Sequence, residues 1–295
     1  MELLSADIAT SRPLTADKVW VVDREVHVLD GVELSIEDGT TILLLNGDVP
    51  SSQLGRAALI FDPGSRLSAT RFAVRAGSAK HRISHISDNG GLWFLGTHAC
   101  GASDGLSVSK QVGQSPSLFR ALLITASHLG RRDPPVSSPA GWDRDDADDI
   151  DAVKLIGVGP DEWQVSQLRS LHSGDDGVDL TNSHIRLHRL EVRQPTEDGV
   201  NLSSSSIEVY RRLWLDVEKT AECDRALFDF ETDDGGCLVE LARSCWVRLN
   251  GVFGDQLCLS SQDMPAPVVT DDNEVSYLFS GRLKADALVY SLSQD

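Results

Sequence analysis

The chain has 295 residues, 41% of them apolar, and its 45 acidic against 27 basic residues give a formal net charge of −18. A negative field of that size repels nucleic acid and anionic membranes, so we expect neither as a partner and expect a glycan ligand to be neutral or basic. No apolar run reaches 18 residues and no signal peptide is visible, so we expect a cytoplasmic protein, or a secreted one whose leader was removed.

The first coils are predicted between residues 18 and 45, where apolar and polar residues alternate as in half-buried strands. Four short strands are expected there: 19–22, 26–29, 32–36 and 41–45. Asp30-Gly31 and Asp38-Gly39 lie between strands, where glycine supplies a positive φ and aspartate caps the turn. Residues 1–17 are expected to cap this end of the fold.

The segment 131–151 interrupts the strand pattern with three prolines and seven aspartates. Polar segments of this length are loops rather than coils. It lacks the glycine and glutamate positions of an EF-hand, so we interpret it as a long acidic loop and not as a calcium loop.

A repeat of 22 residues lies between residues 154 and 217. The sequence DGVDL at 176–180 aligns with DGVNL at 198–202, and the same offset pairs Ile185 with Ile207. A period near 22 with three short strands in each copy is typical of coils that stack about 4.8 Å apart. We therefore predict an all-β, right-handed parallel β-helix with three parallel sheets over residues 18–261, and a C-terminal cap over 262–295.

Two stretches carry a resemblance to known proteins. Residues 18–44, KVWVVDREVHVLDGVELSIEDGTTILL, resemble the opening coils of pectate-lyase-like β-helix proteins. Residues 57–101, with FDPGSRLSAT and GGLWFLGTHACG, are similar to the next coils of bacterial β-helix proteins that have DDG repeats and no settled activity. The resemblance covers residues 18–260 and implies a fold, since this superfold hosts many unrelated activities.

An acidic cluster is predicted on the repeat, because the offset of 22 stacks Asp175 on Glu197 and Asp176 on Asp198. Carboxylates about 5 Å apart repel each other unless they are solvated, protonated or bridged by a cation. Three functional alternatives follow: a Ca²⁺ site formed by these four acids, a general acid/base pair, or a docking face for a basic partner. The structural alternative is that Asp-Gly simply forms a turn.

The catalytic alternative assigns the acid and base roles to Asp175 and Asp176. Gly174-Asp175-Asp176 resembles the Gly-Asp-Asp of polygalacturonase-type hydrolases, whose matching aspartates are the acid and the water-activating base, but the other motifs of that family are absent. Asp179, expected outward above Asn201, is a further partner, and His172 is the candidate proton shuttle.

A second column of side chains is predicted to face solvent on the strand after residue 183, because Ile185 and Leu187 point inward. The repeat places Glu208 against Arg186, which is also an ordinary cross-strand pair. The predicted ligand-binding residues on this face are His184, Arg186, His188, Tyr210 and Trp214.

These observations favour a carbohydrate-recognising β-helix whose ligand face runs along Asp175, Glu197, Asp179 and His184. If it is an enzyme, we expect a glycoside hydrolase or a polysaccharide lyase. The alternative is a non-catalytic scaffold, of spike or assembly type, that docks a basic protein surface. Ca²⁺ is the one cofactor that the sequence suggests, and the pattern leaves a homo-oligomer open.

Overall fold

The computed structural model describes residues 1–45, 57–78, 80–85, 90–98, 115–131, 150–217, 226–232, 235–252, 258–260 and 276–291. Every regular element within these ranges is a β-strand, which confirms the predicted all-β class. No helix in the described ranges is long and apolar enough to cross a membrane. Most of the predicted acidic loop, residues 132–149, lies outside the description, as do residues 262–275 and 292–295 of the predicted C-terminal cap.

The strands form two sheets. The smaller sheet contains β4 (Glu25–Val28), β7 (Ala58–Phe61), β10 (Leu92–Leu95), β12 (Val153–Ile156), β14 (Val178–Thr181), β16 (Val200–Ser203) and β18 (Phe228–Glu231), all parallel. The main path of the larger sheet is β1 (Glu2–Leu4), β3 (Val19–Val22), β6 (Thr40–Leu45), β9 (Arg71–Gly77), β11 (Leu118–Ser127), β13 (Trp163–Leu171), β15 (His184–Arg193), β17 (Ser206–Asp216), β19 (Cys237–Leu241), β23 (Ala287–Ser291) and β21 (Cys258–Ser260). Beside this path lie β2 (Arg12–Leu14), β5 (Glu33–Ile36), β8 (Arg66–Ala69), β20 (Trp246–Val252) and β22 (Ser276–Arg282).

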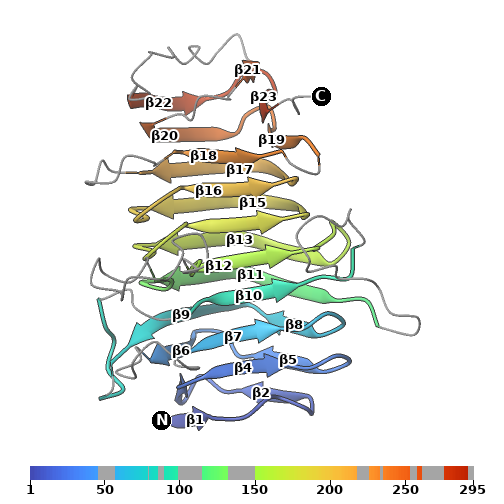
Figure 1. Cartoon of the computed structure of the whole chain (residues 1–295), viewed down its shortest axis with the longest axis vertical. Helices are drawn as coiled ribbons and strands as arrows, with labels where there is room; N and C mark the ends of the chain where they lie inside the picture. The colour runs from blue at the N-terminus through green and yellow to red at the C-terminus, as the bar shows by residue number, and fades with distance from the viewer. Residues whose placement is uncertain are drawn as a thin grey trace, which may run out of the picture.

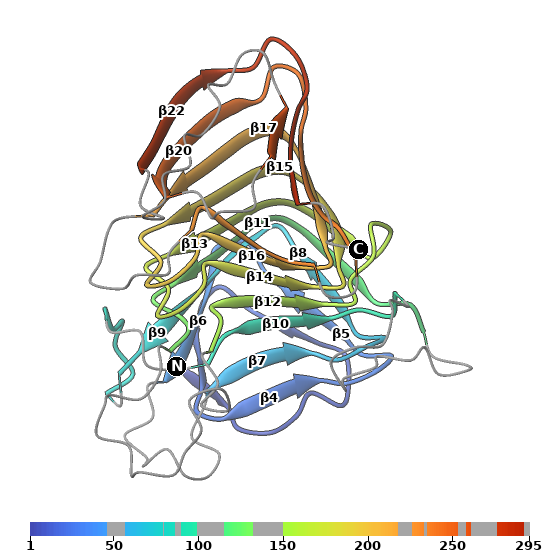
Figure 2. The ribbon, with the colours of Figure 1, turned by 45° about the horizontal axis from the view of Figure 1, so that its top comes forward.

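The strands are stacked in successive layers along one axis, with β1 near one end and β22 near the other (Figure 1). Figure 2 shows the smaller sheet as a row of strands that lie side by side from β4 to β16. The first seventeen residues belong to this stack, because Glu2 pairs with Trp20 and Arg12 pairs with Leu34 in parallel register. At the other end of the stack, β22 pairs antiparallel with β20 and β23 pairs antiparallel with β19. These two strands therefore cover the sheet edges of β20 and β19.

The 22-residue register holds in the centre of the chain. Val178 pairs with Val200 and Ile185 pairs with Ile207, as the repeat predicts. The register shifts between Leu187 and Arg189 of β15, where β17 contains one extra residue. Outside this region the layers are unequal, because β4, β7 and β10 are separated by longer segments of chain than the repeat.

The core consists of apolar residues stacked from layer to layer. Ile185, Ile207 and Val239 pair in sequence and are all buried. The rings of Phe61 and Phe94 stack with their centroids 5.1 Å apart. One layer cannot bury these side chains alone, so the hydrophobic free energy depends on contact between neighbouring layers.

Candidate functional site

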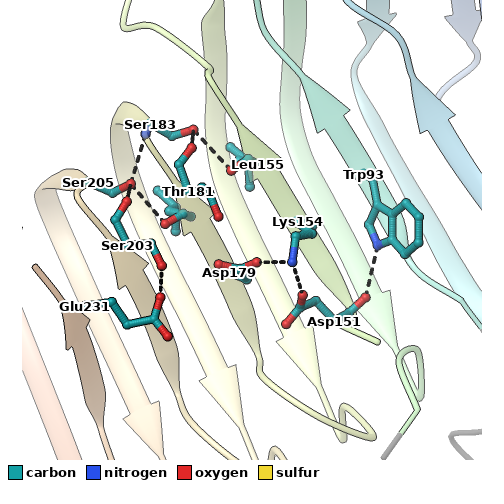
Figure 3. Close-up of polar contacts among 11 residues, drawn as sticks. Trp93, Asp151, Lys154, Leu155, Asp179, Thr181, Ser183, Ser203, Ser205 and Glu231 are labelled. Atoms are coloured by element: carbon teal, nitrogen blue, oxygen red, sulfur yellow. Dashed lines mark hydrogen bonds and ion pairs between the residues drawn. The ribbon is translucent and has the colours of Figure 1, made fainter. Parts of the chain in front are cut away.

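Asp179 is the one predicted acid within a strand of the smaller sheet, and it belongs to an ion-pair network; the other acids precede β14 and β16. Lys154 of β12 pairs in register with Asp179 of β14, and Asp179 pairs with Asn201 as predicted. Figure 3 shows the Lys154 ammonium between two carboxylates, with its Nζ 2.6 Å from Asp179 Oδ2 and 2.8 Å from Asp151 Oδ2. Lys154 is therefore the counter-ion of this cluster.

These carboxyl groups are buried rather than solvated. Asp175, Asp176 and Asp179 expose 3%, 6% and 4% of their surface, which corrects the expectation that they form a solvent-facing acid surface. Burial and then repulsion from Asp198 and Asp151 raise the pKa of Asp176 well above its usual value. Burial and the neighbouring Asp151 raise the pKa of Asp179 to about 7, against the opposing effect of Lys154.

Lys154 has the opposite shift. Its burial disfavours the ammonium, but the attraction of Asp179 and Asp151 outweighs burial and raises the pKa of Lys154. The lysine is therefore charged throughout the physiological range. The region contains one fixed positive charge, on Lys154, and two carboxyls, those of Asp176 and Asp179, that hold protons more tightly than free aspartate.

Asp176 and Asp198 connect neighbouring layers through the backbone. The Asp198 N–H donates to Asp176 Oδ1 at 2.9 Å, and the Ala226 N–H donates to Asp198 Oδ1 in the next layer. A buried backbone N–H without an acceptor raises the free energy of the folded state, so each carboxyl stabilises the fold by accepting one. The two carboxyls therefore stabilise the fold through contacts between layers, and not through the local turn that the structural alternative assigned to these two Asp-Gly steps.

The glycines of these steps have a different role from those near the N-terminus. Gly31 and Gly39 have positive φ, as predicted. Gly177 does not, but a Cβ built on it would lie 2.6 Å from the carbonyl oxygen of Gly199. Close approach of neighbouring layers, and not turn conformation, therefore excludes a side chain at position 177.

The described residues contain no group of three or more His, Cys, Asp or Glu side chains that is arranged to hold a metal ion. The four acids predicted to bind Ca²⁺ thus do not form such a group, and Glu197 is half-buried while Asp198 is buried. His172, the predicted proton shuttle, stacks on His128 with ring centroids 4.7 Å apart. His128 in turn contacts His85, and burial lowers the pKa of His128.

The second predicted column lies on β15 and β17 of the larger sheet. Arg186 Nε lies 3.1 Å from Glu208 Oε1, which confirms the predicted pair. His188 and Tyr210 are in contact, with ring centroids 5.9 Å apart. His184 is half-buried: its Nδ1 lies 2.8 Å from Ser206 Oγ, and burial lowers the pKa of its ring.

Trp214, the last predicted ligand residue, lies among arginines. Its ring is 4.8 to 5.0 Å from the guanidinium carbons of Arg193, Arg212 and Arg248. Arg212 also contacts Trp246 at 4.9 Å, so it lies close to two indole rings. Contacts of this length between guanidinium and indole are attractive.

Sequence reasoning missed a pocket beside this column. Its volume is about 640 Å³, and its lining includes Arg189, Tyr210, Arg211, Arg212, Trp246 and Arg282. Arg189 pairs with Arg212, Arg212 with Trp246 and Trp246 with Arg282, so four neighbouring strands supply one row of side chains. In the sequence, the Tyr-Arg-Arg run at 210–212 is the one local indication of this pocket. The run alone does not predict the row, because the row also requires the register shift and the antiparallel strand β22.

Comparison with known proteins finds no family model, no curated protein and no solved structure that matches this chain.

Proposed function

We propose that the chain is a right-handed parallel β-helix with three sheets, related in fold to the pectate-lyase-like proteins that residues 18–44 resemble. The chain alternates between the two observed sheets from β12 to β18, as successive coils would. The third sheet is inferred from β11, which pairs with β8 over its first part and with β9 over its second. Crossovers between parallel strands are right-handed in nearly all proteins.

This β-helix, in our proposal, recognises a carbohydrate on the outward face of β15, β17 and β20. The observation that carries the proposal is the pocket in which Tyr210, 39% exposed, lies beside arginine and serine donors. An aromatic ring packs against the apolar face of a sugar, and convergent donors bind the sugar oxygens. Arg186 and His188 lie on the first part of β15, before the register shift, and do not line this pocket.

In this proposal the buried acids stabilise the fold by connecting neighbouring layers. Asp176 accepts a backbone N–H of the next layer, and Asp179 pairs with Lys154. Glycoside cleavage is a second candidate, with Asp179 as the general acid, but Asp179 is 4% exposed, pairs with Lys154 and lies on the smaller sheet, so cleavage there needs a second sugar site outside the pocket. The scaffold alternative required acids on the surface, and burial of Asp175, Asp176 and Asp179 removes that support.

A glycan array with the whole protein tests the proposal. We expect the wild type to bind at least one glycan class, and Tyr210→Ala to weaken that binding by about tenfold or more, equivalent to about 1.4 kcal/mol. Leu122→Ala is the matched control, because Leu122 is an exposed apolar residue of β11 outside the pocket. A wild type that binds no glycan, or equal losses in the two variants, would contradict the proposal.

Cleavage is tested separately by reducing-end release from the glycans that bind. If Asp179 is a general acid at such a second site, Asp179→Asn should abolish product while Tyr210→Ala, on the larger sheet, leaves product release unchanged. Binding without any product from the wild type assigns the acids to the fold alone.

A further inference from the structure

We propose that the arginine pocket binds a tetrahedral oxyanion ester, sulfate or phosphate, carried on a saccharide. This inference rests on the proposed function and specifies the ligand. It also separates local charge from total charge: the chain has a net charge of −18, yet four arginines line this one pocket. A pocket responds to the charges around it, so a basic pocket can bind an anion on an acidic protein.

The pocket arginines have no acidic partners in the part of the chain that the structure describes. Two other arginines of β15, Arg186 and Arg193, pair with Glu208 and Glu191 at 3.1 Å. No ion pair of this kind involves the four pocket residues, which are Arg189, Arg211, Arg212 and Arg282. Like charges gathered in a pocket repel one another, so an anionic ligand would lower the free energy of the bound state.

Arg212 is held in place by aromatic contacts, and its Nε donor has no acceptor among the described residues. Arg212 contacts the rings of Trp214 and Trp246, and this restricts its side chain before a ligand arrives. Its Nε is buried and finds no hydrogen-bond acceptor among the described residues, and neither does the Nε1 of Trp214. Buried donors are normally satisfied, so the Nε of Arg212, a residue that lines the pocket, indicates a missing acceptor there, whereas Trp214 lies outside the lining.

The number of donors favours an oxyanion ester over a carboxylate. A guanidinium presents five N–H groups in a planar fork, whereas a carboxylate has only two oxygens. A sulfate or phosphate ester has three terminal oxygens that can accept from several arginines at once. A volume of about 640 Å³ is also within the usual range for small ligands and accommodates sugar residues around the ester.

The total charge argues against a nucleic acid as the source of that oxyanion. Duplex DNA carries one charge per about 1.7 Å along its axis, so most of its phosphates would lie outside the pocket in the negative field of the chain. A saccharide with isolated ester groups avoids that repulsion.

The test is a titration of the intact protein with each probe, in which binding is measured by tryptophan fluorescence or by calorimetry. The probes are maltotetraose, its 6-O-sulfated form, its 6-O-phosphorylated form, inorganic sulfate and a single-stranded DNA oligomer. We expect the sulfated or the phosphorylated sugar to bind at least tenfold more tightly than the neutral sugar and than inorganic sulfate. The better of the two esters identifies the natural group. Tighter binding of the DNA oligomer would overturn the inference in favour of a nucleic acid.

Matched variants locate the site. Arg211→Gln and Arg282→Gln change exposed pocket residues and should each weaken binding of the ester by about tenfold or more, with unchanged circular dichroism and melting. Arg71→Gln removes an equal charge that lies outside the pocket and that Asp38 already neutralises, so the affinity of this variant should stay within about twofold of the wild type. Equal losses in all three variants would indicate a nonspecific charge effect and refute the site.

The inference and the proposed function fail in different ways. If the wild type binds glycans on the array but has the same affinity for the ester and neutral sugars, the ester inference is wrong and carbohydrate recognition stands. If it binds no glycan, charged or neutral, both are wrong.

Discussion

Replacing Asp176 with asparagine should stabilise the protein at pH 8 and change it little at pH 5. Asp176 is buried, its pKa is raised well above the usual value, and its Oδ1 accepts the backbone N–H of Asp198 at 2.9 Å. Asparagine keeps an acceptor of the same shape, but it cannot ionise beside Asp198 and Asp151. The variant therefore removes the charge and retains the hydrogen bond.

The direction of the pH effect follows from proton linkage. The native state holds the Asp176 proton more tightly than the unfolded chain, so the free energy of unfolding falls as the pH rises from about 4 toward the raised native pKa. Each pH unit in this window costs about 1.4 kcal/mol for one such group. Asp179, with its pKa raised to about 7, adds a dependence of the same sign.

Asp176→Ala is the matched control, because it removes both the charge and the acceptor. It should lose about 1–3 kcal/mol for the unsatisfied Asp198 N–H, a loss that asparagine avoids. Urea unfolding of the wild type and both variants at pH 5 and pH 8 measures these differences. If the asparagine variant loses as much stability as the alanine variant at both pH values, the Asp176 carboxyl is not a protonated acceptor of the Asp198 N–H in the native state.

Three further substitutions test the packing. Ile207→Asp places an unpaired charge in the apolar column and should unfold the centre of the stack, seen as a loss of β signal in circular dichroism. Lys154→Met leaves two buried carboxyls without their counter-ion and should cost about 3–5 kcal/mol in urea unfolding at pH 8. That cost should shrink at pH 5 because Asp179 is then protonated, and an equal cost at both pH values would contradict the ion-pair account. Gly96→Ala puts a Cβ 2.0 Å from the Gly157 oxygen and should lower stability by about 1–3 kcal/mol, whereas an unchanged urea midpoint would contradict this close contact.

The central register was predictable from the sequence because the apolar pattern has a period of two and recurs every 22 residues. That pattern fixes Ile185 opposite Ile207 and directs Arg186 to the surface beside Glu208. The same offset would pair Leu190 with Arg212, but the extra residue in β17 pairs Leu190 with Leu213. The consecutive polar residues of the Tyr-Arg-Arg run indicate this bulge only in retrospect.

Burial of the acids was not predictable, because it depends on contacts between layers. The sequence predicts Asp176 in a turn and Asp179 on the outward side of its strand, yet neighbouring layers supply the Asp198 N–H and the Lys154 ammonium that they bind. The row of arginines that lines the pocket could not be predicted from the sequence either. Arg282 comes from an antiparallel strand more than sixty residues after Arg212, and no repeat relates the two.

A crystal structure of the protein with its best-binding saccharide tests the central claim most directly. The account predicts sugar density on the outward face of β15, β17 and β20, with a ring against Tyr210 and an anionic group among Arg211, Arg212 and Arg282. Density over Asp179 and Lys154 on the smaller sheet, with the arginine pocket unchanged, would contradict it.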